Sequence, residues 1–269
     1  MAATVDRDRK AIPGSLGRLL ERTFFQLQQA DSEGEAYHPR GRAGLSLALN
    51  RALVERGLRA PWMWSPERCQ EFWANIERGE DVNAPNGYAA KSTEIVDLLH
   101  EFWQPEVAAN DVILEVGCNA GANLAALHAL GYSHLSGVEI NPHAIAEMRR
   151  AFPALARDAV IHQGRVEEVL PKLPSDSVDV VFAMAVLHHI HPASRWIFAE
   201  MVRIARRHVC VLEPERVVSH YVFCRDYGRV FTGLGCRQLR EVEIGHSGFP
   251  RVSHDYHGYT ARLFSVPSP

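Results

Sequence analysis

The chain has 269 residues, of which 46% are hydrophobic and 23% charged, so it can bury a sizeable core and is not a disordered chain, a collagen or a disulfide mini-protein. Its 29 Lys and Arg against 32 Asp and Glu give a net charge of −3, which argues against a general attraction for nucleic acid or an anionic membrane. We expect no membrane span, because no apolar run reaches about 18 residues, and no secretion signal, because MAATVDRDRK is charged. Five scattered cysteines without a C-x-x-C pair are typical of reduced thiols and favour a cytoplasmic protein.

The first 90 residues predict helices separated by irregular stretches. The helical patterns are GSLGRLLERTFFQLQQ (14–29), SLALNRALVERGL ending at Gly57, and SPERCQEFWANIERG capped by Ser65 and ending at Gly79. A further helical pattern, KSTEIVDLLHEFW (91–103), follows them. A turn-rich segment, GEDVNAPNGYAA, precedes the last of these. We therefore expect residues 1–90 to form a helical extension or lid and residues 91–269 to form the main domain.

From Asp111 onward, short apolar strands alternate with helical patterns, which indicates βαβ units and a parallel sheet. The expected strands are Val112–Val116, His134–Ile140, Val160–Gln163, Val178–Met184 and His208–Leu212. The expected helices are Ala122–Leu130, Pro142–Phe152, VEEVLPKL and Pro192–Arg206. The tail adds a helix-like stretch, Val217–Phe231, and two candidate strands, Arg237–Ile244 and Tyr259–Val266. The prediction is an α/β fold with a mostly parallel seven-stranded sheet, a C-terminal antiparallel hairpin and an N-terminal helical extension.

The segment ILEVGCNAGANL predicts a ligand site at the first strand's end. The strand runs into Gly117, the chain turns, and Gly121 opens the next helix. In a doubly wound fold, a nucleotide-like ligand lies at this turn. The second strand ends in Glu139, where a carboxylate can accept hydrogen bonds from both ribose hydroxyls. A glycine turn with an acidic strand end indicates an adenosyl ligand.

Two residues of this segment bear on which adenosyl ligand is bound. Asn119 occupies the middle glycine position of the dinucleotide fingerprint, where a pyrophosphate needs a close approach to the backbone. Glu115, at the end of the first strand, would repel phosphates and suits a ligand with an ammonium or sulfonium group. Both residues argue against a nicotinamide dinucleotide.

With its acidic residue, x, glycine, three residues and glycine, the stretch Glu115-Val116-Gly117 through Gly121 resembles the first motif of class I S-adenosylmethionine (SAM)-dependent methyltransferases. The resemblance covers about Tyr88 to Val266 and is greatest to the small-molecule branch. It implies a doubly wound, Rossmann-like fold, SAM as cofactor and S-adenosylhomocysteine (SAH) as product.

The resemblance also assigns parts of the cofactor to residues. The methionine half would be lined by Glu115, Gly117, Cys118, Asn119, Gly121, Ala183 and Met184. Glu139 would hold the ribose, with Ile140 and Asn141 against the adenine, and Tyr88 could close over the cofactor.

At the adenine the chain departs from the family pattern. The family often has an acidic residue after the third strand, whereas this chain has Arg165. Backbone groups of Gly164, Arg165 and Val166 are therefore the expected adenine contacts.

The fourth strand leads into AMAVLHHIHP, which resembles the family's segment at this place. His188 or His189 could take a proton from an attacking hydroxyl or amine, because imidazole titrates near neutral pH. The alternative, favoured for each histidine taken singly, is that they cap or pack beneath the next helix. No metal site is expected, because the histidines match no known ligand spacing.

The acceptor should lie against residues outside the motifs. One candidate wall is the extension with Trp62, Trp64 and Trp73, although core packing is the better interpretation for these tryptophans. The other is the tail, with substrate candidates His220, Tyr221, Arg225, His254 and Tyr256. For the His- and Tyr-rich loop, a substrate wall and a solvated loop remain equally open.

The resulting prediction is methyl transfer from SAM to an oxygen or nitrogen of a small molecule. No nucleic-acid partner is expected, since Met184-Ala185-Val186-Leu187 replaces the [DN]-P-P-[FYW] motif of base methyltransferases. No membrane partner is expected either. The alternatives are a methyltransferase acting on a protein or peptide side chain, an NAD-dependent oxidoreductase, and a cofactor-binding protein without catalysis.

Overall fold

The computed structural model describes residues 42–60, 63–79, 83–91, 94–215, 220–244, 256 and 258–267. Its centre is a seven-stranded sheet in the order β3-β2-β1-β4-β5-β7-β6. The strands are β1 (Val112–Val116), β2 (His134–Glu139), β3 (Val160–Gln163), β4 (Val178–Met184), β5 (Ala205–Pro214), β6 (Arg237–Glu243) and β7 (Tyr259–Ser265). Strands β1 to β5 are parallel, and β7 lies antiparallel between β5 and β6. The predicted fold class is confirmed.

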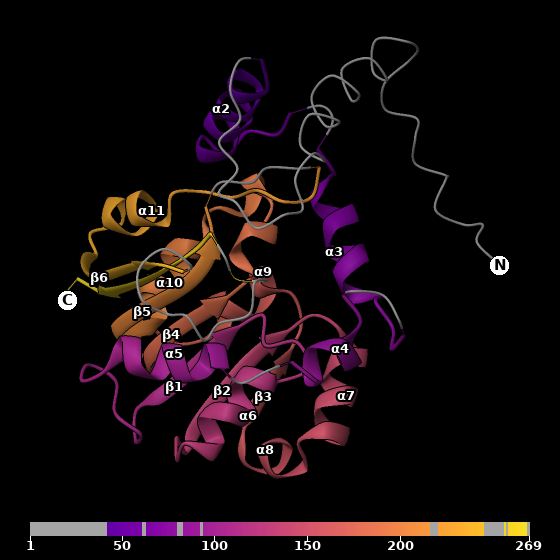
Figure 1. Ribbon diagram of the computed structural model, residues 1–269, viewed down its shortest axis with the longest axis vertical. Helices are drawn as coiled ribbons and strands as arrows, with labels where there is room; N and C mark the ends of the chain where they lie inside the picture. The colour runs from indigo at the N-terminus through magenta and orange to yellow at the C-terminus, as the bar shows by residue number, and fades with distance from the viewer. Residues whose placement is uncertain are drawn as a thin grey trace.

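Helices cover both faces of the sheet (Figure 1). They are α2 (Arg42–Glu55), α3 (Pro66–Ala74), α4 (Pro85–Ala89), α5 (Glu94–Trp103), α6 (Ala122–Ala129), α7 (Pro142–Ala151), α8 (Pro153–Asp158), α9 (Val166–Val169), α10 (Ile197–Ile204) and α11 (Tyr227–Gly233). Alternate residues of each central strand enter different cores, so that Ile113 packs with α5 and α6 while Leu114 packs with α10. Strands buried on both faces explain the continuous apolar runs in the sequence.

Several predicted helix boundaries were wrong. Helix α3 ends at Ala74 rather than Gly79. The predicted helix Pro192–Arg206 is a 3₁₀ turn followed by α10, and it ends early because β5 already begins at Ala205. The predicted helix Val217–Phe231 begins only at Tyr227, where Asp226 caps α11. Helices α4 and α8 were not predicted, and the pattern at 14–29 lies outside the described residues.

The described part of the extension lies against the edge of the sheet where the parallel strands end. Figure 1 shows α4 beside α7, with α3 above α4. The Asn141 side-chain amide donates to the carbonyl of Ile76, just after α3 (2.8 Å). The Trp64 amide donates to the carbonyl of His220 (2.7 Å). In the described part of the chain, none of the helices combines the length and apolar character that crossing a membrane would require.

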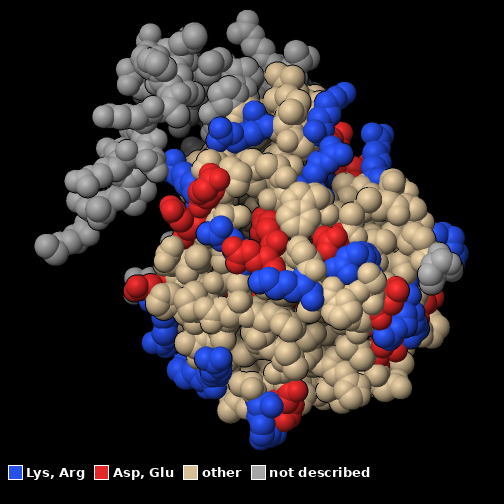
Figure 2. All heavy atoms as spheres, turned by 180° about the vertical axis from the view of Figure 1, so that it is seen from behind, with Lys and Arg blue, Asp and Glu red and all other residues tan. Residues whose placement is uncertain are grey.

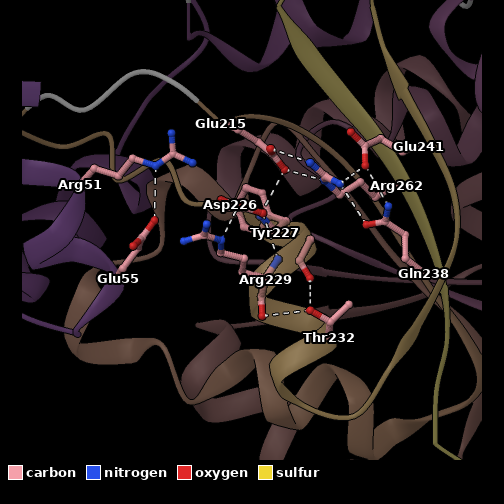
Figure 3. A network of polar contacts seen from close by, with 11 residues as sticks. Arg51, Glu55, Glu215, Asp226, Tyr227, Arg229, Thr232, Gln238, Glu241 and Arg262 are labelled. Carbon is pink, nitrogen blue, oxygen red and sulfur yellow. Dashed lines mark hydrogen bonds and ion pairs between the residues drawn. The ribbon is translucent and has the colours of Figure 1, made fainter. Parts of the chain in front are cut away.

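A buried ion-pair network holds the far end of the sheet together. Arg262 on β7 binds both carboxylate oxygens of Glu215 (2.8 and 2.9 Å) and also contacts Gln238 and Glu241 on β6 (Figure 3). Glu215 in turn accepts a hydrogen bond from the backbone of Tyr227 at the start of α11 (3.1 Å). This network ties β6, β7 and α11 to the end of β5.

Candidate functional site

A pocket lies at the carboxyl ends of the central strands and encloses about 1390 Å³ of free space, counting its open mouth. Its floor is the turn after β1, the end of β2 and the loop after β4. Its cover comes from the extension, with α3 contributing Gln70 and Trp73, and α4 contributing Tyr88. Strand ends of a doubly wound sheet are the usual ligand site of this architecture.

The turn after β1 depends on glycine for a reason that the sequence did not reveal. Gly117 has a φ of +72°, and a Cβ atom added there would lie 2.3 Å from Cγ2 of Val186. The glycine is therefore needed for the close approach of the chain's own loop after β4. Asn119 also has a positive φ, +46°, which asparagine tolerates better than most residues.

Glu139 places a fixed carboxylate in the pocket. One oxygen accepts a hydrogen bond from the backbone of Asn119 (2.8 Å) and the other from the backbone of Asn141 (2.7 Å). The residue is 7% exposed, and burial raises the pKa of its carboxyl group. Since it lines the pocket, this acceptor could bind ribose hydroxyls.

The structure corrects the expectation for Glu115. Its side chain is fully buried and does not line the pocket. One oxygen accepts from the side-chain amide of Asn123 (2.7 Å), and burial raises the pKa of Glu115 to about 8. A carboxyl group that is mostly protonated at neutral pH offers little charge to a cationic ligand. Asn123, which the sequence analysis did not single out, lines the pocket in its place.

Most other predicted cofactor residues do line the pocket. These are Tyr88, Gly117, Cys118, Asn119, Ile140, Asn141, Gly164, Arg165, Val166 and Met184. Gly121 and Ala183 do not; a Cβ atom at Gly121 would lie 2.6 Å from Met148, so this glycine permits helix packing.

The Asn141 side chain is already engaged. Its oxygen caps α7 by accepting from the backbone of His143 (2.9 Å), while its amide nitrogen bonds to Ile76. Its side chain thus ties the extension to α7 beside the pocket.

The three histidines after β4 have three different surroundings. His188 is buried, does not line the pocket, and places Nδ1 2.7 Å from the carboxylate of Glu213, so the expectation that it could act as base is wrong. His191 Nδ1 accepts from the backbone of Ala193 (3.1 Å), which is the predicted capping role. His189 lines the pocket, with Nδ1 3.3 Å from the carbonyl of Tyr221 and its ring 4.3 Å from that of Trp73 between centroids. Burial lowers the pKa of all three.

The tail residues divide in a way that the sequence did not predict. Arg225 is 2% exposed and donates to backbone carbonyls, so the expectation that it contacts substrate is wrong. His220 and Tyr221 pack their rings against Trp64 of the extension and do not line the pocket. Tyr256 does line it. His254 lies outside the described residues.

Two pocket residues were missed or interpreted differently. Trp73 was expected in a core, but it forms part of the pocket wall against His189. Lys91 also lines the pocket, with Nζ 4.0 Å from the centre of the Tyr88 ring. A tryptophan at helical spacing gives no sign of which way it faces. Among the described residues, no group of three His, Cys, Asp or Glu side chains could hold a metal ion.

Comparison with known proteins agrees with this geometry. Residues 114–211 match the family model described as "Methyltransferase domain". A geranyl diphosphate C-methyltransferase from Streptomyces coelicolor A3(2) is similar in structure, at 11% identity and a TM-score of 0.55, covering 77% of this chain and 98% of its own. A magnesium protoporphyrin IX methyltransferase from Synechocystis PCC 6803 is similar at 10% identity and a TM-score of 0.53, covering 75% and 94%. No curated protein matches the chain in sequence.

The same fold also serves other chemistry. The [4+2]-cyclase SpnF is similar at 13% identity and a TM-score of 0.53, covering 75% of this chain and 91% of its own. At such identities the structural likeness shows the fold alone, and the matched domain carries the activity.

The matched domain, the strand order and the glycine turn together define a class I SAM-dependent methyltransferase. Residues 114–211 of the chain thus form a methyltransferase domain, set in a sheet of the strand order described above. The matched domain therefore favours methyl transfer over the nicotinamide-dependent alternative.

Proposed function

We propose that this methyltransferase transfers the methyl group of SAM to an oxygen or nitrogen of a small-molecule acceptor. The observation that carries the proposal is the cover of the pocket. Helices α3 and α4 bring Gln70, Trp73 and Tyr88 over the strand ends. A protein or peptide side chain would need an open groove, whereas this roof favours a ligand that fits beneath it. Residues 1–90 would then serve as a lid and acceptor wall.

The pocket suits SAM in its polar and apolar groups. Glu139 would accept from the ribose hydroxyls, and the Gly164–Val166 segment would contact the adenine. Arg165 points its guanidinium toward Glu168 (3.8 Å), which leaves backbone groups as the adenine contacts. The turn at Gly117 and Asn119 would line the methionine half together with Met184, and Lys91 would provide the positive charge for its carboxylate.

His189 is the residue that we assign as general base. When bound, SAM supplies a methyl group already activated by its sulfonium. The chain's task is to orient the acceptor, exclude water and accept a proton. With its Nδ1–H directed at the carbonyl of Tyr221, His189 would present Nε2 as a proton acceptor. Burial lowers its pKa, which keeps the ring neutral and ready to accept at pH 7. A weak base of this kind suits an acidic hydroxyl, and a neutral amine needs orientation alone.

The net charge of −3 and the charges on one face of the molecule support a small-molecule partner over nucleic acid. Lys and Arg side chains are interspersed with Asp and Glu on the face that Figure 2 shows, without a field of a single sign. Backbone binding to nucleic acid requires a clustered basic surface. All five cysteines are buried and none forms a disulfide bond, which supports our proposal of a reducing, cytoplasmic setting.

A panel of acceptors tests the proposal. The full chain is incubated with SAM and phenols, aliphatic alcohols, amines or lysine-containing peptides, and SAH is quantified by mass spectrometry together with the methylated product. We expect SAH and a methylated product with at least one small hydroxyl or amine. The control is SAM alone, which measures background hydrolysis. Methylation of peptides alone would contradict the proposal.

A further inference from the structure

We propose that Glu213 and Arg225, two buried charged residues outside the pocket, are positioning residues that clamp the loop after β4 from two sides and so hold His189 in place. The inference rests on the base that the proposed function assigns to His189. Glu213 is 0% exposed and Arg225 is 2% exposed, and neither lines the pocket. Buried charges are rare unless they are well paired, so their partners indicate what they do.

Glu213, at the end of β5, binds the amide side of the loop. Its carboxylate accepts from the backbone N–H groups of Val186 (2.9 Å), Leu187 (2.8 Å) and His188 (3.4 Å). The ring of His188 contacts the same carboxylate through Nδ1. Burial raises the pKa of Glu213 to about 7, and these backbone hydrogen bonds oppose that rise by stabilising its charged form. All of them lie just before His189 in the chain.

Arg225 binds the carbonyl side of the same loop. Its guanidinium donates to the carbonyls of Leu187 (3.3 Å), Phe223 (2.8 Å) and Ile190 (2.8 Å). The 3₁₀ turn Leu187–His189 thus has a carboxylate on its N–H groups and a guanidinium on its carbonyls, each complementary to the peptide dipoles it meets. The rigid fork of arginine is suited to bind two carbonyls of one loop at a fixed spacing.

The loop needs such fixing because it begins with an unfavourable backbone conformation. Ala185 has a φ of +57°, in the left-handed region that is unfavourable for a residue with a Cβ atom. The conformation persists where surrounding contacts determine it, and the amide of Ala185 is held by the carbonyl of Leu212 (3.0 Å), one residue before Glu213. Without the clamp, relaxation at Ala185 would move the residues that follow it.

The clamp acts on His189 through its two neighbours in the chain. His188 is fixed by Glu213, and its carbonyl accepts from Phe223 (2.6 Å); Ile190 is fixed by Arg225. The segment with Phe223 also carries Tyr221, whose carbonyl faces His189 Nδ1. The clamp therefore fixes both the place of the ring and the partner that selects its protonated nitrogen.

Side-chain NMR of ¹⁵N-labelled histidines tests the clamp without an acceptor. His189 is assigned with His189→Gln, and its two ring nitrogens report the tautomer. In the wild type we expect mainly the Nδ1–H tautomer. In Glu213→Gln, which cannot accept from all the loop donors, we expect averaged tautomer shifts for His189. SAH affinity by calorimetry should change less than about threefold, because Glu213 does not line the cofactor site.

The matched control is Glu215→Gln, which removes the other buried glutamate near the end of β5. Its partner is Arg262 (Figure 3), so thermal stability should fall while the His189 shifts stay as in the wild type. Unchanged His189 shifts in Glu213→Gln, or the same change in Glu215→Gln, would overturn the clamp. If Glu213→Gln does not fold, Arg225→Lys is tested instead, because lysine cannot bind the carbonyls of Leu187 and Ile190 together as the guanidinium does. The same averaged His189 shifts are then expected.

Turnover provides a second readout once the panel identifies an acceptor. Glu213→Gln should lower kcat by about tenfold or more while KM for SAM is little changed, since displaced general bases lose rate rather than cofactor binding. In a His189→Ala background the same substitution should have no further effect. Additive losses would show that Glu213 acts elsewhere. Failure of wild-type turnover with every acceptor would count against the proposed function, whereas the NMR result judges the clamp alone.

Discussion

The two halves of the pocket are built in different ways. The cofactor half is formed by short continuous stretches of chain that are held in place mainly by backbone hydrogen bonds. The backbone N–H groups of Asn119 and Asn141, for example, donate to the carboxylate of Glu139. The half around His189 is assembled by side chains from segments far apart in the chain: Trp73 in α3 forms part of the wall, and Glu213 in β5 lies behind the loop that carries His189. The difference indicates that damage to the first half should reduce cofactor binding, while damage to the second should reduce turnover.

The largest effect should come from His189→Ala. Loss of a positioned general base lowers turnover by about 10²- to 10⁴-fold. SAH affinity should stay close to that of the wild type, because the residue serves proton transfer. Steady-state kinetics with the acceptor from the panel and SAH calorimetry together measure the split. An equal loss of SAH affinity would contradict the assignment of cofactor binding and turnover to separate halves of the pocket.

Gly117→Ala should be the most damaging change in the cofactor half. Its Cβ atom would clash with Val186, and its φ of +72° is unfavourable for alanine. We therefore expect the free energy of unfolding to fall by about 2–4 kcal/mol and SAH to bind more weakly. The control is Gly131→Ala, which shares a positive φ of +93° but would place its Cβ atom in open space. Urea unfolding of both variants isolates the clash. Equal losses would mean that strain alone, not the contact with Val186, makes Gly117 necessary.

Glu139→Ala should weaken SAH binding. Hydrogen bonds to a charged acceptor contribute about 1.5–3 kcal/mol, which corresponds to about 10- to 100-fold in affinity. Glu139→Gln should lose less, since its amide oxygen can still accept. Calorimetry with SAH measures both variants. Wild-type affinity in Glu139→Ala would refute the assignment of this residue to the ribose.

The last prediction concerns the pH dependence of stability. The folded pKa of Glu115 is raised to about 8 while the unfolded value stays near 4.5, so the folded state holds a proton that the unfolded state releases. Its stabilising contribution is complete below the unfolded pKa and declines as pH rises toward the folded value. In Glu115→Gln this decline disappears, so between pH 5 and pH 8 the thermal midpoint should fall less than in the wild type. Parallel midpoint curves for the two proteins would contradict a raised pKa.

The elements that could be predicted from the sequence are those with a signal in their own short stretch of chain. The seven strands were identifiable because each is a short apolar run between turns, and Glu139 because it ends a strand at a known distance from the glycine turn. Those signals depend on neighbours in the chain and do not require knowledge of packing.

The residues that depend on tertiary contacts were not predictable. Arg225 was placed among the substrate candidates because sequence does not reveal that its guanidinium is buried against carbonyls 35 and 38 residues away. His188 and His189 are adjacent and chemically identical in sequence, yet one lies behind the loop against Glu213 and the other faces the pocket. Glu115 carried a charge argument that burial cancels.

The contact between Gly117 and Val186 has an evolutionary consequence. Because the space at one position is filled by the side chain of the other, the two sites cannot drift separately. A larger residue in place of Gly117 would fit only if a smaller residue replaced Val186. The pair therefore restricts how a new acceptor specificity can arise in this chain. Any change in the loop after β4 must keep the contact between Val186 and the turn at Gly117.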